Sequence, residues 1–200
     1  MPYEYLKLTR EEQQAVVEAR RQRGFPLHSP PHPFREAGSY LITSANFEHR
    51  PIMASSERRT QFQEILLDGF QEIRVEIIGW VVLPNHYNVL VNIESLELVS
   101  NLLKHVHGST AHEWNLQDGL TGKRKVWYRF LDRMMRNESH LNQPLNYIHL
   151  NPLKHKLVDD IYDWPWSSLL MYEEENGREW LRERWRKFVP ADDFGKGWDM

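Results

Sequence analysis

The feature that most constrains the fold is a pair of apolar, β-branched runs in the middle of the chain. Residues 73–83 read IRVEIIGWVVL, and residues 87–93 read YNVLVNI. Both compositions predict β-strands, because branched and aromatic side chains pack well on a pleated surface. Pro84-Asn85 breaks the pattern between them and separates the two strands. The centre of the chain is therefore expected to form a β-sheet.

Weaker patterns on both sides of this pair complete the expected fold. Residues 39–45 (SYLITSA) predict an opening strand, and residues 126–134 predict the last one. Apolar side chains at helical spacing predict helices over residues 57–71, 96–114 and 139–149. The order β-α-β-β-α-β predicts an α+β, ferredoxin-like fold: an antiparallel sheet with helices on one face. The additional C-terminal helix carries Tyr147.

The ends of the chain have a different character from this core. Residues 9–23 predict a surface helix, because Thr9 and Glu12 have the spacing of a capping box. Residues 25–34 hold four prolines and predict an irregular connector. We therefore expect an N-terminal appendage over residues 1–37, a main domain over residues 38–170 and a C-terminal tail over residues 171–200.

Composition excludes several classes of chemistry. The 200 residues include no cysteine, which rules out disulfides, thiolate catalysis and cysteine zinc sites. Any metal ion would be held by His, Asp, Glu, Asn or Gln side chains. The polar N-terminus has no signal-peptide pattern, and the longest apolar run, residues 77–84, is too short to span a bilayer. We expect a cytoplasmic protein that makes no membrane contact.

The charge distribution matters more than the net charge of −3. Residues 121–156 contain eight Lys or Arg and two acidic residues, so one face is locally basic. Such a face fits phosphate binding, although an ordinary solvated surface has the same pattern. Trp127 and Tyr128 could stack on unpaired bases, with core packing the commoner fate of such residues. The candidate phosphate contacts are Lys123, Arg124, Lys125, Arg129, Arg133 and Arg136.

Two strings carry candidate catalytic residues. In the first, GWVVLPNHYNVLVNI, His86 and Asn88 are two apart, so both side chains leave the same face of a strand and can reach one metal ion. In the second, NYIHLNPLKHKLV, Tyr147 and Asn151 share one helix face. A tyrosine can attack phosphorus, and an amide oxygen can complete a metal shell. Taken singly, each string also fits an exposed polar pair or an ordinary hydrogen-bonded tyrosine.

Together, and in this order, these strings resemble the IS200-like, single-tyrosine transposases, and within them the REP-associated tyrosine transposases. The resemblance covers about residues 39–168. It includes SYLITSA, the Pro84-Asn85-His86 string, Val126-Trp127, Tyr147-Ile148 with Asn151-Pro152, and DWPWSS at residues 163–168. It implies DNA transposition, with single-stranded DNA that carries hairpins as the partner and either a monomer or a homodimer as the assembly.

The resemblance also implies a mechanism. In this family paired histidines hold a divalent ion, Mg²⁺ or Mn²⁺, which polarises the scissile phosphate while the helix tyrosine forms a 5′-phosphotyrosine. By position, His86 is a metal ligand, Tyr147 is the nucleophile and Asn151 is a candidate third ligand. The family's second histidine is Asn88 here, which offers a neutral amide oxygen and a weaker metal site. Two outcomes stay open: a transposase that cuts, or a domesticated hairpin-binding protein with weak or no cleavage.

Overall fold

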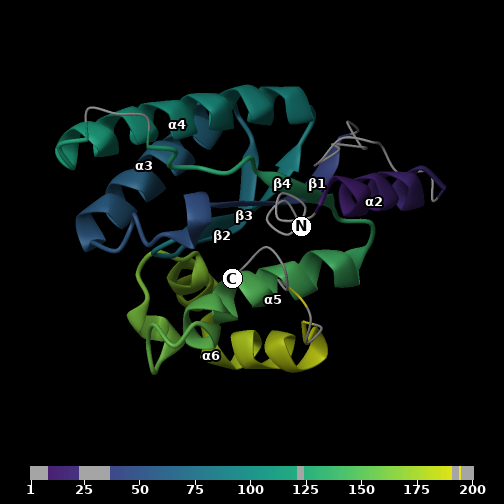
Figure 1. The fold of residues 1–200 in the computed structure, drawn as a ribbon. Coiled ribbons are helices and arrows are strands. Elements are labelled where there is room, and N and C mark those ends of the chain that lie inside the picture. Colours follow the sequence, from purple (N-terminus) through teal and green to yellow (C-terminus); the bar gives the residue numbers. More distant parts are fainter. Residues whose placement is uncertain (1–8, 23–36, 121–123, 191–193, 195–200) are drawn as a thin grey trace. The chain divides into compact units, whose positions relative to one another are not determined.

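The computed structural model describes residues 9–22, 37–120, 124–190 and 194 (Figure 1). The chain divides into two compact units, residues 1–35 and 36–200. Within the first unit, helix α2 covers Arg10–Gln22. The predicted capping box is present, because the Thr9 hydroxyl accepts the Glu12 N–H at 3.3 Å and the Thr9 N–H donates to the Glu12 carboxylate at 2.8 Å. The predicted connector at residues 25–34 lies outside the described residues.

A four-stranded antiparallel sheet forms the middle of the second unit. Its strands are β1 (Gly38–Ala45), β2 (Glu76–Val82), β3 (His86–Ile93) and β4 (Leu131–Met134). Their order across the sheet, β2-β3-β1-β4, is the ferredoxin-like order, so the predicted fold class is confirmed. The two apolar runs that dominate the sequence form β2 and β3, which are direct antiparallel neighbours.

Two helices cover one face of the sheet, as expected. They are α3 (Ser56–Glu72) and α4 (Leu96–Gln117), and Figure 1 shows α4 above the strands and α3 to their left. The Ser55 hydroxyl caps α3 by accepting the Arg58 N–H. Phe62 from α3 packs against Tyr87 of β3 and Trp114 of α4, and all three side chains are fully buried. Each such side chain contributes about 1.5–3 kcal/mol on removal from water.

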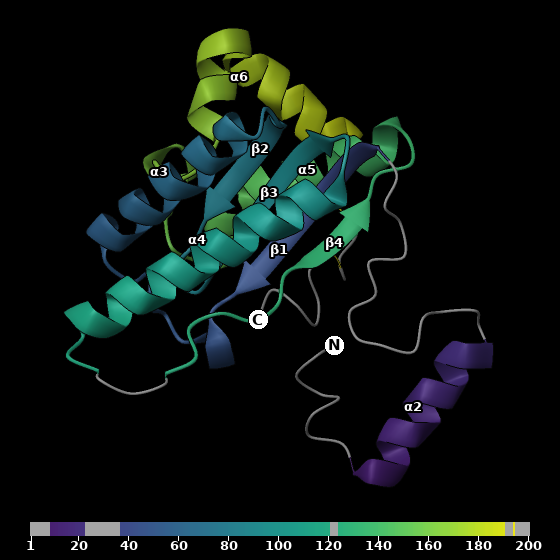
Figure 2. The same cartoon turned by 90° about the horizontal axis from the view of Figure 1, so that it is seen from above.

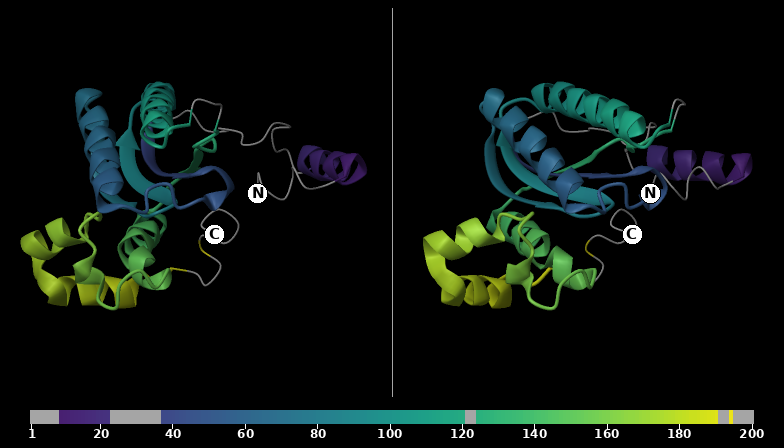
Figure 3. Two further views of the ribbon diagram at one scale, coloured as in Figure 1. Left: turned by 60° about the vertical axis from the view of Figure 1, so that its left-hand side comes forward. Right: turned by 90° about the vertical axis from the view of Figure 1, so that its left-hand side faces the viewer.

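The other face of the sheet is covered by α5 (Glu138–Lys154), the helix that carries Tyr147. Figure 2 shows α5 behind the sheet when α3 and α4 lie in front, and Figure 3 shows the layers from the side. Leu145 of α5 packs so close to β2 that a Cβ at Gly79 would lie 2.5 Å from its methyl carbon. The absence of a side chain at Gly79 therefore leaves room for Leu145 against β2.

The DWPWSS string runs along the outer edge of β2. The Val82 N–H donates to the Trp166 carbonyl, and the Ser168 N–H donates to the Trp80 carbonyl, both at 2.9 Å. The Trp164 indole N–H donates to the Val82 carbonyl at 3.1 Å. These bonds satisfy an edge that would otherwise stay unpaired.

The residues after this string do not form only a tail. Helix α6 covers Leu169–Lys187, with a break at Gly177, whose φ of 81° is left-handed. Leu181 is buried, and the Asn146 side chain of α5 donates to the carbonyls of Arg184 and Phe188 at 2.9 and 2.8 Å. Most of the expected tail over residues 171–200 is therefore a helix packed on α5, because its apolar side chains find a partner there. No helix in the described part of the chain is long and apolar enough to cross a membrane.

The last strand is shorter than predicted. Regular pairing covers Leu131–Met134, whereas the prediction began at residue 126. Val126 is buried, and Trp127 makes a single bridge to Asn46. The backbone leaves the sheet there because these two side chains turn into the core.

Candidate functional site

His86 opens β3 directly after the Pro84-Asn85 turn, and its side chain is fully buried. Its Nδ1 lies 2.8 Å from the Asn85 amide oxygen. That oxygen can only accept a hydrogen bond, so Nδ1 carries the hydrogen and Nε2 keeps its lone pair. A bond of this kind to the other ring nitrogen is what orients a metal-binding histidine.

Asn88 leaves the same face of β3 but is tied to the neighbouring strand. Its amide oxygen accepts a hydrogen bond from the Thr43 hydroxyl of β1 at 2.6 Å, and the two residues are register partners. The Asn88 side-chain nitrogen is buried and has no hydrogen-bond partner within the described chain. An amide nitrogen is a donor and offers no lone pair to a metal ion.

Tyr147 and Asn151 lie one turn apart on α5, as their spacing predicted. Asn151 is fully buried, and neither polar atom of its side chain has a hydrogen-bond partner among the described residues. Leaving buried polar atoms unsatisfied costs about 1–3 kcal/mol, so such a group marks a place that a bound ligand completes. The orphaned oxygen of Asn151 therefore fits a metal ligand.

His155 was missed in the sequence analysis. It follows the last residue of α5, one turn beyond Asn151, and its ring centroid lies 5.3 Å from that of His86. Burial, together with the nearby His86 and Lys154, lowers the pKa of His155 to about 4, so the imidazole is neutral at pH 7. The sequence does contain a signal for His155, because residues 147, 151 and 155 are spaced four apart and would share one helix face. The predicted helix ended at residue 149, so His155 was not included in it.

The Tyr147 ring is almost fully buried between a cation and an aromatic ring. The Lys154 ammonium lies 3.4 Å from the Tyr147 hydroxyl and 4.7 Å from the ring centroid. Burial lowers the pKa of Lys154. The Phe194 ring stands 4.7 Å from the Tyr147 ring, and the Phe194 carbonyl accepts a hydrogen bond from Lys154 at 3.1 Å. A cation beside the phenol oxygen suits a nucleophile that must carry negative charge.

The described structure gathers no three His, Cys, Asp or Glu side chains into a metal cluster. An ion at the start of β3 would therefore need an amide oxygen beside the histidines. Asn151 supplies that oxygen, and Mg²⁺ and Mn²⁺ both accept amide ligands. His149, only two residues from Tyr147, contacts Ser168 at 3.0 Å instead, so it belongs to the packing between α5 and the β2 edge.

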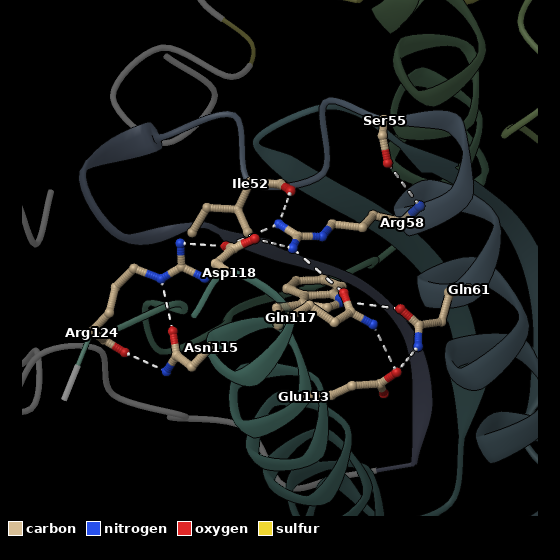
Figure 4. Close-up of polar contacts among 10 residues, drawn as sticks. Ile52, Ser55, Arg58, Gln61, Glu113, Asn115, Gln117, Asp118 and Arg124 are labelled. Carbon is tan, nitrogen blue, oxygen red and sulfur yellow. Dashed lines mark hydrogen bonds and ion pairs between the residues drawn. The ribbon is translucent and has the colours of Figure 1, made fainter. Parts of the chain in front are cut away.

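The predicted phosphate contacts fall into two groups. Lys125, Arg129, Arg133 and Arg136 have exposed side chains, whereas Lys123 lies outside the described residues. Arg124 is different, because its guanidinium pairs with Asp118 at 2.8 Å and donates to Asn115 at 2.8 Å (Figure 4). Asp118 also pairs with Arg58, and these bonds, that of Arg58 foremost, lower the pKa of its carboxyl. Arg124 is thus held at the end of α4 by Asn115 and by Asp118, and it shares the Asp118 carboxylate with Arg58.

Trp127 corrects another expectation. Its side chain is buried, its indole N–H donates to the Thr110 hydroxyl at 3.0 Å, and its ring stacks on His107 at 4.6 Å. It is a core residue and cannot stack on a base without leaving the core. Tyr128, its neighbour, is half-buried instead and faces Phe47 at a centroid distance of 5.0 Å, with the Lys125 ammonium over both rings.

Comparisons with known proteins agree with this architecture. A ferredoxin-like sheet whose far face carries a tyrosine helix, opposite a histidine of the central strand, is the arrangement expected of IS200-like transposases. The chain is 30% identical over 135 residues to the REP-associated tyrosine transposase of Escherichia coli (strain K12), covering 66% of this chain and 77% of that protein. A second relative of the same group, from Haemophilus influenzae, is 21% identical over 144 residues and is covered over 81% of its length. The chain therefore belongs to the REP-associated tyrosine transposases.

A solved structure gives the same fold. A REP-associated tyrosine transposase bound to a REP hairpin superposes with a TM-score of 0.58 at 20% identity, covering 75% of this chain and 87% of that one. No protein-family model matches the chain.

Proposed function

We propose that this protein binds single-stranded DNA carrying REP-type hairpins and cuts it through Tyr147 with the help of a divalent ion. The relative whose structure holds a REP hairpin supports the choice of DNA. The observation that carries the cleavage is the stripe of Tyr147 and Asn151 on α5, the helix that packs on β3, whose first residue is His86. Nucleophile and candidate ligands come from two elements packed on each other.

The reaction follows from the chemistry of these groups. The Tyr147 oxygen attacks the phosphorus, an O–P bond forms, and the bond from phosphorus to the preceding 3′-oxygen breaks. The phenol proton is lost, the 3′-oxygen takes up a proton, and a 5′-phosphotyrosine and a free 3′-hydroxyl result. Lys154 stabilises the phenolate before attack. Attack by another 3′-hydroxyl reverses the step and transfers the strand without ATP.

The chain's own residues would also hold the ion. His86 through Nε2 and Asn151 through its orphaned oxygen are the ligands that the buried geometry favours. When bound, Mg²⁺ or Mn²⁺ supplies Lewis-acid stabilisation of the negative charge that develops on the phosphate. The exposed side chains of Arg129, Arg133 and Arg136 supply the sequence-independent affinity for the backbone.

A second candidate function is hairpin binding with weak or no cleavage. It is favoured by Asn88, whose oxygen is hydrogen-bonded to Thr43 where the family has a second histidine. It is also favoured by Phe194, whose ring packs against Tyr147. Both functions share the same DNA and differ only in the covalent step.

The two are separated by incubating REP-type hairpin oligonucleotides with the protein and Mn²⁺ or Mg²⁺. Cleavage predicts a covalent protein–DNA adduct on a denaturing gel. Tyr147→Phe should reduce this adduct by at least ~10⁴-fold, because it removes the nucleophile, while hairpin binding is retained. Tyr162→Phe, in the short 3-10 helix Ile161–Asp163 outside the proposed site, is the matched control and should leave the adduct unchanged.

The remaining outcomes decide between the candidates. Salt-sensitive hairpin binding without any adduct, in either metal ion, supports the binding protein. An adduct that persists in Tyr147→Phe would assign the nucleophile elsewhere. Failure to bind hairpins at all would overturn both functions.

A further inference from the structure

We infer that His155 is a metal ligand of this protein, and that the pair His86 and His155 takes the place of two histidines on one strand. The inference rests on the proposed function, because it names the side chains that hold the ion invoked there. It starts from the contact between the His86 and His155 rings, whose centroids lie 5.3 Å apart at an interplanar angle of 67°.

The separation of the two rings matches a shared ion. Imidazoles that bind one metal at ~2.1 Å place their ring centroids roughly 4.5–5.5 Å apart. The two rings come from different elements. His86 is the first residue of β3 and His155 is the residue that ends α5, so an ion bound by both would lie where these two ends meet.

Neighbouring groups already set the chemistry of this pair. The Asn85 oxygen holds the hydrogen of His86 on Nδ1 and leaves the lone pair on Nε2. His155 is held at the end of α5 by its own backbone N–H, which donates to the Asn151 carbonyl at 3.0 Å. Its imidazole is half-buried, so the ring is accessible to a ligand yet partly shielded from water.

Asn88, which stands where the family has its second histidine, is a poorer ligand than His155. The Asn88 oxygen is engaged by Thr43 at 2.6 Å, and the atom left without a partner in the described chain is a nitrogen. Binding a metal through Asn88 would break this buried hydrogen bond.

Asn151 completes the set. Its fully buried, unsatisfied oxygen lies one helical turn before His155 on the same stripe as Tyr147. The resulting donors are two imidazole nitrogens and one amide oxygen. Nitrogen donors favour first-row transition ions, so we expect Mn²⁺ and Co²⁺ to bind more tightly than Mg²⁺.

Isothermal titration of the full chain with Mn²⁺ and Co²⁺ tests this without DNA or activity. We expect His86→Ala and His155→Ala each to weaken Mn²⁺ binding by at least ~10–100-fold, and Asn88→Ala to change it by less than ~3-fold. His105→Ala is the matched control, since His105 is an exposed histidine of α4. Circular dichroism melting checks that each variant is folded. If His155→Ala does not fold, His155→Gln takes its place in the titration.

The number of imidazole ligands on bound Mn²⁺ can also be measured by spectroscopy. Electron spin-echo modulation of bound Mn²⁺ should report two imidazole nitrogens in the wild type and one in His155→Ala. A single imidazole in the wild type, or Mn²⁺ affinity that falls with Asn88→Ala and not with His155→Ala, overturns the inference. No uptake of either ion overturns it too.

These results are independent of the test of cleavage. If Mn²⁺ binds without His155 while the Tyr147 adduct forms, the ligand assignment fails and the proposed function stands. If both histidines bind Mn²⁺ but no adduct forms, the assignment stands and the cleavage fails.

Discussion

The two faces of the sheet show how differently one strand can be used. On one side, β3 presents Tyr87, Val89 and Val91 to α3 and α4. The polar atoms there are satisfied: the Tyr87 hydroxyl meets His107 at 3.0 Å, and the Trp114 indole donates to Gln61 at 2.9 Å. This face is a conventional core, in which nearly every buried polar group is paired.

On the other side, β3 presents His86, Asn88 and Leu90 to α5. Unsatisfied atoms gather here, namely the Asn88 nitrogen and both amide atoms of Asn151 within the described chain. A protein keeps buried polar groups in that state where a bound group completes them. The face that stabilises the fold and the face that carries the site are therefore separated by the thickness of one sheet.

The largest expected effect comes from breaking the conventional core. Trp114→Ala should destabilise the protein by about 3–5 kcal/mol, because it leaves a cavity among fully buried side chains and removes the bond to Gln61. Urea unfolding followed by circular dichroism measures the loss. A loss below about 1 kcal/mol would show that this face is not the main source of stability.

Acid should weaken both faces through two buried histidines. Burial lowers the pKa of His107 and of His149 to about 3, the latter with a contribution from Arg184, against about 6.5 in the unfolded chain. The unfolded state therefore binds more protons between pH 6.5 and 3. Stability is fully present above pH 6.5 and falls by about 1.4 kcal/mol per pH unit for each histidine below it.

Unfolding free energies measured between pH 7 and 4 check this slope. His149→Gln keeps a polar partner for Ser168 but cannot be protonated, so it should remove the part of the slope that His149 contributes and leave the parts from His107 and from His155, whose pKa is lowered to about 4. An unchanged slope in that variant would mean that His149 is protonated in the folded protein.

A smaller effect is expected where α5 approaches the sheet. Gly79→Ala places a Cβ 2.5 Å from the Leu145 methyl carbon and 3.2 Å from the Ser168 hydroxyl. Leu145 must turn its side chain or α5 must shift, at a cost of about 1–3 kcal/mol, and a shift of α5 moves Tyr147 and Asn151 with it. We expect adduct formation to fall more than hairpin binding does. Gly108→Ala, where a Cβ meets nothing within 4 Å, is the control.

The smallest effect on stability is expected at Asn151, and it tests the contrast between the two faces of the sheet most directly. Asn151→Leu replaces an orphaned amide by an apolar side chain of similar size, so thermal unfolding should show a gain of about 1 kcal/mol or no loss. Metal binding and cleavage should fall in the same variant. A clear loss of stability would mean that Asn151 is a structural residue with partners, and would remove it from the proposed site.

Local spacing already determined much of this protein. The order of strands and helices, the capping box at Thr9, the shared face of His86 and Asn88, and the stripe of Tyr147 and Asn151 all follow from the periods of strand and helix. Those periods act within a few residues, so they can be read from the sequence before any tertiary contact is known.

The tertiary structure decided what depends on distant partners. Trp127 belongs to the core because Thr110 and His107 contact it there, and Arg124 is held in an ion pair because Asp118, at the end of α4, lies beside it. His155 meets His86 only because α5 continues through Pro152 and lies against β3. Periodicity says which side of a helix a residue occupies, whereas packing alone decides what stands opposite.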